Sequence, residues 1–266
     1  MVKNTKIMVK SPLVSVLMLT YNRGQFISKA INSVLSQTYR SLELIIIDDG
    51  STDDTCLIIN NFNDSRIEYI QHHENRGLAV RRAESATLAK GDFVAILDSD
   101  DIWIDEKKIA IQVAYMMAHL DCSIVGSFIK IIDKNGVVLG SRRFCIVDSK
   151  IRKNILIRNQ FVHSSVLIRG SALKAVKGYA EIPFAEDLEL FLKIGRNGEF
   201  SNIPNFMTLY RLHSNNESSK KILLLSYVLR IINKYKIDYP NSIFANIKYK
   251  AYILSLKILN YLQPKD

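Results

Sequence analysis

The chain has 266 residues, a length that fits one large domain or two small ones. Apolar residues make up 48% of it and charged residues 23%, which excludes a disordered chain and a fibrous protein. Its three cysteines form no C-x-x-C pair, so a disulfide scaffold and a zinc knuckle are excluded and a reducing compartment is indicated.

The net charge of +10 is concentrated at the two ends of the chain. Residues 220–266 carry nine basic and two acidic side chains, and residues 1–10 add three lysines, whereas residues 11–219 are neutral. A nucleic-acid-binding protein more often spreads its basic charge over the folded body, so we expect no nucleic-acid partner. Basic ends around a neutral body fit binding to an anionic membrane surface at least as well as binding to a nucleic acid.

The sequence predicts neither a secretory signal nor a membrane span. Lysines occupy the start of the chain, where a signal peptide needs an apolar core. No window reaches the roughly 18 uncharged apolar residues that cross a bilayer. We therefore expect a cytoplasmic protein, either soluble or peripheral on the inner face of the cell membrane.

The first half of the chain alternates short apolar runs with helical patterns. Ser51, with Asp54 three residues later, resembles a capping box that opens one of the helices. Such alternation, with strands that are almost continuously apolar, predicts an α/β fold whose mixed, mainly parallel sheet has helices on both faces. Strands are expected at 14–19, 42–47, 67–70 and 93–97, and helices at 26–35, 53–61, 78–89 and 105–119.

The second half is less regular. Its patterns predict a hairpin over 124–139, strands at 165–169 and 206–210 that extend the sheet antiparallel, and a helix over 186–195. We therefore predict one domain over residues 1–219 and a basic, amphipathic helical extension over residues 220–266. That extension fits an interfacial helix on the membrane, and packing on the body or a homo-oligomer contact is the alternative.

Polar clusters stand where three of the predicted strands end, and ligands bind at the carboxyl ends of parallel strands. The clusters are Thr20-Tyr21-Asn22, Asp48-Asp49 and Asp98-Ser99-Asp100. Two carboxylates spaced i, i+2 suit a divalent cation that takes oxygen ligands, Mn²⁺ or Mg²⁺, and an acidic helix start is the structural alternative.

Other polar residues also have two interpretations. Asp49 suits a hydrogen bond to a base or ribose, or a cap on the following helix. The pair Glu186-Asp187 suits a general base, or charge that complements a helix dipole. Arg82 suits a diphosphate contact, or a solvated surface charge. The shape of a sugar pocket would depend on residues near 161–165 or Phe184.

Three blocks in this order resemble the inverting glycosyltransferases of family 2, which have the GT-A fold, a Rossmann-like fold of nucleotide-diphospho-sugar transferases. The blocks are SVLMLTYN, IIDDGSTDDT and DSDD, and the pair Glu186-Asp187 follows them. The resemblance covers about three quarters of the chain, from Val14 to His213.

The resemblance implies a role for single residues. Asp187 is expected to be the catalytic base, and Asp100 and His213 are expected to lie at the metal. Arg81 and Ala83 depart from the family pattern around Arg82, where Ala and Asn are usual. The residues expected to bind the donor nucleotide are Thr20, Tyr21, Asn22, Asp49, Arg82, Asp98 and Ser99.

The implied activity is transfer of a hexose or N-acetylhexosamine from a UDP-sugar to a saccharide acceptor, which forms a β-glycosidic bond. The acceptor is expected to be polyprenyl-diphosphate-linked or otherwise lipid-linked, in bacterial surface polysaccharide synthesis (O-antigen, capsule or lipopolysaccharide). Two alternatives are a non-catalytic membrane-surface or nucleotide-binding module and a nucleotidyltransferase. The second needs a glycine-rich loop after the first strand, which this chain lacks.

Overall fold

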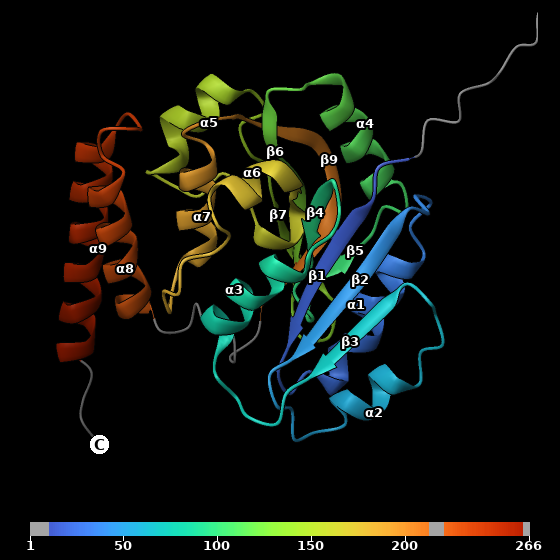
Figure 1. Cartoon of the computed structure of the whole chain (residues 1–266). Helices are drawn as coiled ribbons and strands as arrows, with labels where there is room; N and C mark the ends of the chain where they lie inside the picture. Colours follow the sequence, from blue (N-terminus) through green and yellow to red (C-terminus); the bar gives the residue numbers. More distant parts are fainter. Residues whose placement is uncertain (1–10, 213–220, 263–266) are drawn as a thin grey trace, which may run out of the picture.

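The computed structural model describes residues 11–212 and 221–262. Within them, one mixed sheet has the strand order β3-β2-β1-β4-β8-β6-β9-β5, and β7 pairs with β6 (Figure 1). The strands are β1 (Val14–Thr20), β2 (Leu42–Asp48), β3 (Ile67–Gln71), β4 (Phe93–Ile96), β5 (Ile102–Trp103), β6 (Cys122–Ile132), β7 (Val138–Arg142), β8 (Leu167–Arg169) and β9 (Glu199–Arg211).

Helices cover both faces of this sheet (Figure 1). The first four strands pair in parallel, which confirms the predicted mainly parallel sheet. The helices are α1 (Gly24–Leu35), α2 (Thr55–Asn60), α3 (Leu78–Leu88), α4 (Lys108–Ala118), α5 (Asp148–Ile155), α6 (Gly170–Ala175), α7 (Glu186–Ile194), α8 (Lys221–Lys234) and α9 (Ser242–Leu262), with a 3₁₀ turn η1 (His163–Ser165).

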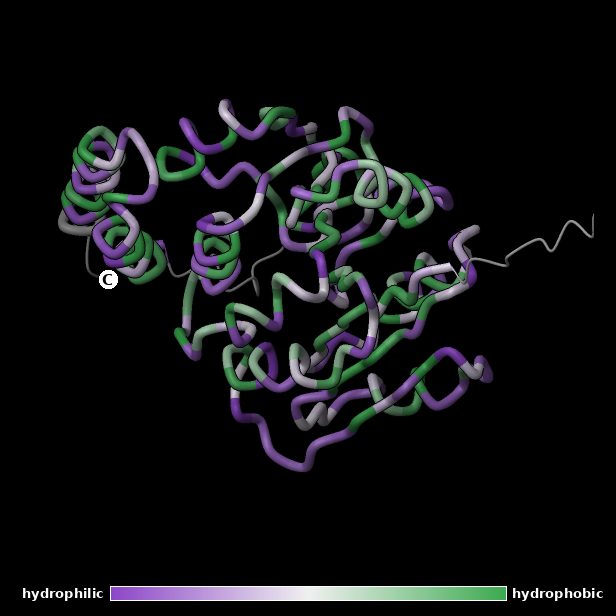
Figure 2. The backbone as a smooth tube through the Cα atoms, turned by 45° about the horizontal axis from the view of Figure 1, so that its top comes forward, coloured by the Kyte–Doolittle hydropathy of each residue, from purple (hydrophilic) through white to green (hydrophobic). Residues whose placement is uncertain are grey.

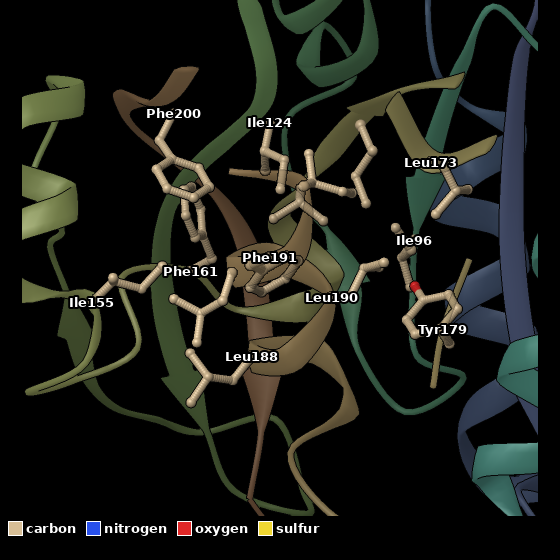
Figure 3. Close-up of a cluster of buried hydrophobic side chains, with 14 of the residues drawn as sticks. Ile96, Ile124, Ile155, Phe161, Leu173, Tyr179, Leu188, Leu190, Phe191 and Phe200 are labelled. Atoms are coloured by element: carbon tan, nitrogen blue, oxygen red, sulfur yellow. The ribbon is translucent and has the colours of Figure 1, made fainter. Parts of the chain in front are cut away.

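The alternation of side chains along the strands builds two large hydrophobic cores, and a smaller third cluster surrounds Phe128 and Ile129 of β6. On β1, Val16 and Met18 face α1 and α4, whereas Leu17 and Leu19 belong to the core shared with α7 and α8. In this second core, Phe161 contacts Phe191 edge to face, with ring centroids 5.2 Å apart (Figure 3). In Figure 2 the central strands are mostly hydrophobic, as expected of a sheet that is covered on both faces.

Several expectations for single elements were wrong. Helix α2 begins at Thr55, and Ser51 does not cap it, because its Oγ accepts a hydrogen bond from the backbone N–H of Asn22. The last strand is longer than predicted and pairs in parallel with β6 rather than antiparallel. Strand β5 and helix α5 were not predicted, and α4 begins at Lys108 rather than near Asp105.

One face of the C-terminal extension packs on the body of the protein. The Tyr235 hydroxyl donates a hydrogen bond to Glu189 of α7 (2.8 Å), and the Tyr239 hydroxyl donates one to the carbonyl of Leu192 (2.8 Å). Ile232 is fully buried in the core that α7 shares. Figure 1 shows α8 and α9 side by side next to α7 and α5. The predicted boundary at 219 falls in residues 213–220, outside the described part of the chain.

The helices of the described residues are too short or too polar to span a bilayer.

Candidate active site

A cavity of about 960 Å³ opens where β1, β2 and β4 end. It brings together residues from all three predicted polar clusters and from the start of α7. His213, the second predicted metal residue, lies outside the described residues. The predicted residues that line the cavity are Thr20, Tyr21, Asn22, Asp49, Arg82, Asp98, Ser99, Asp100 and Asp187.

The turn after β1 is tied to the loop after β2. Asn22 has a left-handed backbone (φ 51°), which Asn tolerates better than most residues. Its side-chain oxygen accepts a hydrogen bond from the backbone N–H of Thr52 (2.8 Å), and its own N–H donates to Ser51 (2.9 Å). This leaves the ring of Tyr21 42% exposed at the mouth of the cavity.

Asp49 holds the loop that precedes α3. Its carboxylate accepts hydrogen bonds from the backbone N–H groups of Arg76 (2.9 Å) and Gly77 (2.8 Å) and from Nε of Arg81 (2.6 Å). It does not cap α2, so that structural alternative was wrong. In the sequence, Arg81 was noted only as a departure from the family pattern. A buried carboxylate such as Asp49 needs a cation beside it, and this requirement could have identified Arg81 as its partner.

Arg82 forms the centre of a buried charge network. It is almost fully buried and donates a hydrogen bond from Nη2 to Asp98, and its Nε lies 3.9 Å from Oε1 of Glu186. Burial acts to raise the pKa of Asp98, but the Arg82 guanidinium outweighs it, so the pKa lies below its usual value. Within the described residues, Nε and Nη1 of Arg82 have no hydrogen-bond acceptor. The cavity thus holds a fixed cation beside an ionised carboxylate.

The two acidic residues that follow Ser99 have different surroundings. Asp101 is buried, and it accepts hydrogen bonds from Oγ of Ser164 (2.5 Å) and from the backbone N–H of Arg211 (2.8 Å). Burial, Asp100 and Asp98 together hold its pKa well above the usual value, which assigns Asp101 a structural role. Asp100 lines the cavity, and its Oδ2 lies 3.5 Å from Nε of Arg23.

The donor set fits a hard divalent cation. Among the described residues, no cluster of three or more His, Cys, Asp or Glu side chains is placed to hold a metal. Mg²⁺ and Mn²⁺ take oxygen ligands, and Mg²⁺ commonly binds proteins through one or two carboxylates while substrate phosphates complete its shell. Asp100, which forms an ion pair with Arg23, offers such a carboxylate in the cavity, and Asp98 forms a closer pair with Arg82.

Asp187 lies in the first turn of α7, at the opposite wall of the cavity. Its Oδ2 accepts a hydrogen bond from the Asn159 amide (3.1 Å), and its Oδ1 accepts one from the backbone N–H of Leu188 (2.7 Å). Burial raises the pKa of Asp187, helped by the charge of Asp98 and opposed by those hydrogen bonds and by Arg82. A carboxylate with a raised pKa is a stronger proton acceptor than an ordinary one.

Two buried partners form a hydrogen-bonded pair at this site. His163 falls in the range 161–165 that was expected near a sugar pocket, whereas Tyr179 was not predicted. His163 lines the cavity, and its Nε2 shares a hydrogen bond with the Tyr179 hydroxyl (2.7 Å). Burial and the charge of Arg82 lower the pKa of His163 to about 3, so the ring is neutral. Because Tyr179 lies far from the cavity strands in sequence, no spacing signal linked it to the site.

The other half of the cavity is less polar. Phe184, which was expected near a sugar pocket, lines it together with Tyr210 and Arg142. The C-terminal extension supplies the remaining wall through Leu224, Val228 and Tyr249. The body thus supplies a charged half, and the extension helps to build an apolar half.

The sequence of this chain matches the family model of glycosyl transferase family 2 over residues 15–178. The chain belongs to this family. As a family 2 member it is a glycosyltransferase, and the predicted resemblance is confirmed.

Relatives among characterised proteins agree with this assignment. The chain is 31% identical to the Escherichia coli UDP-Glc:alpha-D-GlcNAc-diphosphoundecaprenol beta-1,3-glucosyltransferase WfgD, over 86% of this chain and 97% of WfgD. It is 32% identical to the E. coli enzyme WfaP, which carries the same activity name, over 83% of this chain and 86% of WfaP.

Solved structures confirm the GT-A fold. Staphylococcus aureus TarS, in complex with UDP-GlcNAc, superposes with a TM-score of 0.68 at 20% identity, over 83% of this chain and 66% of TarS. The mannosyltransferase PcManGT of Pyrobaculum calidifontis, in complex with GDP-Man and Mn²⁺, gives 0.67 at 18% identity, over 92% of this chain and 70% of that one. At these identities the likeness concerns the fold.

Proposed function

We propose that this family 2 enzyme transfers a hexose or N-acetylhexosamine from a UDP-sugar to a saccharide carried on a polyprenyl diphosphate, in bacterial surface polysaccharide synthesis. The observation that carries the proposal is Asp187, a proton acceptor with a raised pKa that shares one cavity with the cluster at the end of β4. The names of WfgD and WfaP, which the chain matches over most of its length, support the UDP donor and the lipid-linked acceptor.

The charged half of the cavity suits the nucleotide. The exposed ring of Tyr21 offers a stacking surface for a base at the mouth. Thr20 and Asn22 shape the turn beneath it. Nη1 of Arg82, which has no hydrogen-bond acceptor among the described residues, can donate to a phosphate oxygen. Asp49 holds the loop beside this turn. In this proposal Asp98 and Ser99 contact the ribose of the nucleotide.

Asp187 performs the chemistry in this proposal. The acceptor hydroxyl gives its proton to the Asp187 carboxylate while its oxygen bonds to the anomeric carbon of the donor. The bond from that carbon to UDP breaks in the same displacement, with the nucleophile on the opposite face. An α-linked donor therefore gives a β-linked product. One base suffices, and proton transfer of this kind contributes about 10²–10⁴ in rate.

We assign Asp100, with His213 as a second candidate, to a Mn²⁺ or Mg²⁺ ion. When bound, the ion would neutralise the charge that develops on the leaving diphosphate.

UDP titration by calorimetry tests the donor site. We expect binding of UDP to weaken about tenfold or more when EDTA replaces Mn²⁺, because the diphosphate then lacks its cation. Asp100→Asn should show the weak affinity under both conditions. Glu106→Gln, an equal charge change at an exposed side chain outside the cavity, should behave as wild type. Equal UDP affinity with Mn²⁺ and with EDTA in the wild type would contradict the metal assignment.

We also propose that the enzyme is peripheral on the inner face of the cell membrane, through the outer face of α9. This face combines lysines with exposed apolar side chains, as interfacial helices do. Its exposed residues include Ile243, Phe244, Ile247, Lys250, Leu254 and Lys257.

Flotation with phosphatidylglycerol vesicles measures this contact. The double variant Phe244→Ser and Ile247→Ser should lower the vesicle partition coefficient about tenfold, since each buried CH₂ contributes about 0.8 kcal/mol. The matched control replaces Val137 and Val138, two similarly exposed residues in and beside the β6–β7 turn, by Ser. Equal flotation of the two double variants would remove α9 from the membrane contact.

A further inference from the structure

The arginines that line the cavity differ in their partners. Arg23 and Arg82 form ion pairs with Asp100 and Asp98, and Arg81 pairs with Asp49. Arg142, at the end of β7, is half-buried, and within residues 11–212 and 221–262 its side chain has no hydrogen bond or ion pair. A half-buried cation without a carboxylate is a favourable place for a negatively charged ligand.

Two further cations, Arg158 and Lys248, are next in the chain to Asn159 and Tyr249, which line the same cavity as Arg142. The Lys248 ammonium on α9 donates a hydrogen bond to the carbonyl of Ile157 (2.7 Å), and the Tyr249 hydroxyl donates to the same carbonyl (3.2 Å). These bonds hold α9 against the segment that carries Arg158. Burial and then the charge of Arg158 lower the pKa values of both Arg142 and Lys248, while Tyr210 acts to raise the pKa of Arg142. Arg158 thus repels each of the other two cations.

The surroundings of Arg158 and Lys248 hold no compensating acid. Both residues line a second cavity of about 720 Å³, next to Arg143 and Lys150. No Asp or Glu side chain is among the described residues that line it. Mutual repulsion of such cations is relieved by an anion, and guanidinium groups bind phosphate oxygens through two parallel hydrogen bonds.

The position of this cluster relative to the catalytic base identifies which anion fits. Asn159 follows Arg158 in the chain, lines the main cavity and donates its amide hydrogen bond to Asp187. An acceptor sugar whose hydroxyl reaches Asp187 therefore lies beside the segment that carries Arg158. Tyr249, which is next to Lys248 in α9, lines the same cavity, as does Val228 of α8.

We propose that Arg142, Arg158 and Lys248 form the binding site for the diphosphate of the acceptor. This inference rests on the proposed function and adds to it the site at which the lipid-linked substrate is recognised. The donor diphosphate belongs to the other half of the cavity, at Arg82 and Asp100, so the two diphosphates have separate sites.

Calorimetry with geranyl diphosphate tests the site directly. The full-length protein is first saturated with UDP and Mn²⁺, so that the donor site is blocked. Arg142→Gln and Arg158→Gln should each weaken binding about tenfold or more, because each removes a charged hydrogen-bond donor. Lys236→Gln, an exposed lysine in the segment between α8 and α9, should change it less than about twofold. Geraniol, which has no phosphate, should not bind measurably.

Two outcomes would overturn the site in this assay. One is geranyl diphosphate binding to Arg142→Gln and Arg158→Gln as tightly as to the wild type. The other is geraniol binding as tightly as its diphosphate.

Kinetics with two acceptors separates this inference from the proposed function. Both acceptors carry the same N-acetylglucosamine, one on an undecyl diphosphate and one as a plain undecyl glycoside. Arg142→Gln should raise KM about tenfold for the first, with kcat unchanged, and leave the second unaffected. Equal effects on both acceptors would overturn the diphosphate site. If the wild type turned over neither acceptor, the proposed function would fail, and the calorimetric result would still decide the anion site.

Discussion

Replacement of Asp187 by Asn lowers kcat for sugar transfer by about 10²–10⁴-fold, while the Kd for UDP stays within about twofold of wild type. The amide is isosteric and can still accept the hydrogen bond from the Leu188 N–H, so α7 keeps its first turn. It cannot take a proton from the acceptor hydroxyl. Single-turnover transfer and UDP titration on the same preparation measure the two quantities.

The pH dependence gives a second readout of the same residue. Because the pKa of Asp187 is raised, its protonated, inactive form persists to higher pH than that of an ordinary carboxyl. The wild-type kcat should therefore fall as pH decreases through that raised pKa, and this acidic limb should be absent from the residual activity of Asp187→Asn. Glu181→Gln, an exposed acid in the loop before α7, serves as the control. An unchanged limb in Asp187→Asn would assign the base to another group.

Replacement of Arg82 by Met lowers the free energy of unfolding by about 3 kcal/mol, because it leaves Asp98 and Glu186 without their shared cation. The value lies at the lower end for buried ion pairs, since the Asp98 side chain is 30% exposed. Urea denaturation in the absence of ligand measures it. Lys90→Met, which breaks the exposed pair with Glu68, should cost less than about 1 kcal/mol.

A double-mutant cycle identifies the cause of the Arg82 effect. Asp98→Asn in the Arg82→Met background should recover part of the lost stability, because the uncompensated charge is then gone. The sign of the pH dependence follows from the lowered pKa of Asp98. Its ionised form adds stability above the pKa of the unfolded chain, and this contribution disappears as pH falls through the folded-state pKa. Strict additivity of the two substitutions would contradict the pairing.

The parts of the site that the sequence predicted are those that follow from strand ends. An apolar run that stops at a polar cluster identifies both the strand and the edge of the sheet, so the sequence alone is enough to assign Asn22, Asp49 and Asp98 to one cavity. Asp187 was found from a different pattern, because a pair of acids at the start of an amphipathic helix is visible in the sequence. Family resemblance then supplied the roles of these residues, which stay predictions.

Features that depend on long-range pairing could not be predicted. Ser51 and Asp54 have the spacing of a capping box, but the Asn22 N–H competes for the Ser51 oxygen from a distant turn. The parallel pairing of β9 with β6 joins strands far apart in sequence, which no local period reveals. Arg142 was not singled out from the sequence, since its significance lies in having no ion pair with an acid among the residues that the structure describes.

The C-terminal helices have a consequence for the evolution of this enzyme. Residues 221–262 supply Leu224, Val228 and Tyr249 to the wall of the cavity, whereas the polar clusters lie in the turns that follow β1, β2 and β4. The proposed acceptor cations come from two regions of the chain, since Arg142 and Arg158 precede β9 and Lys248 lies in α9. Exchange of the segment downstream of β9 would therefore change the apolar wall and remove Lys248, and it would leave Arg142, Arg158 and the polar clusters in place. Divergence of this one segment gives a lineage a route to altered acceptor choice with the nucleotide-sugar site preserved.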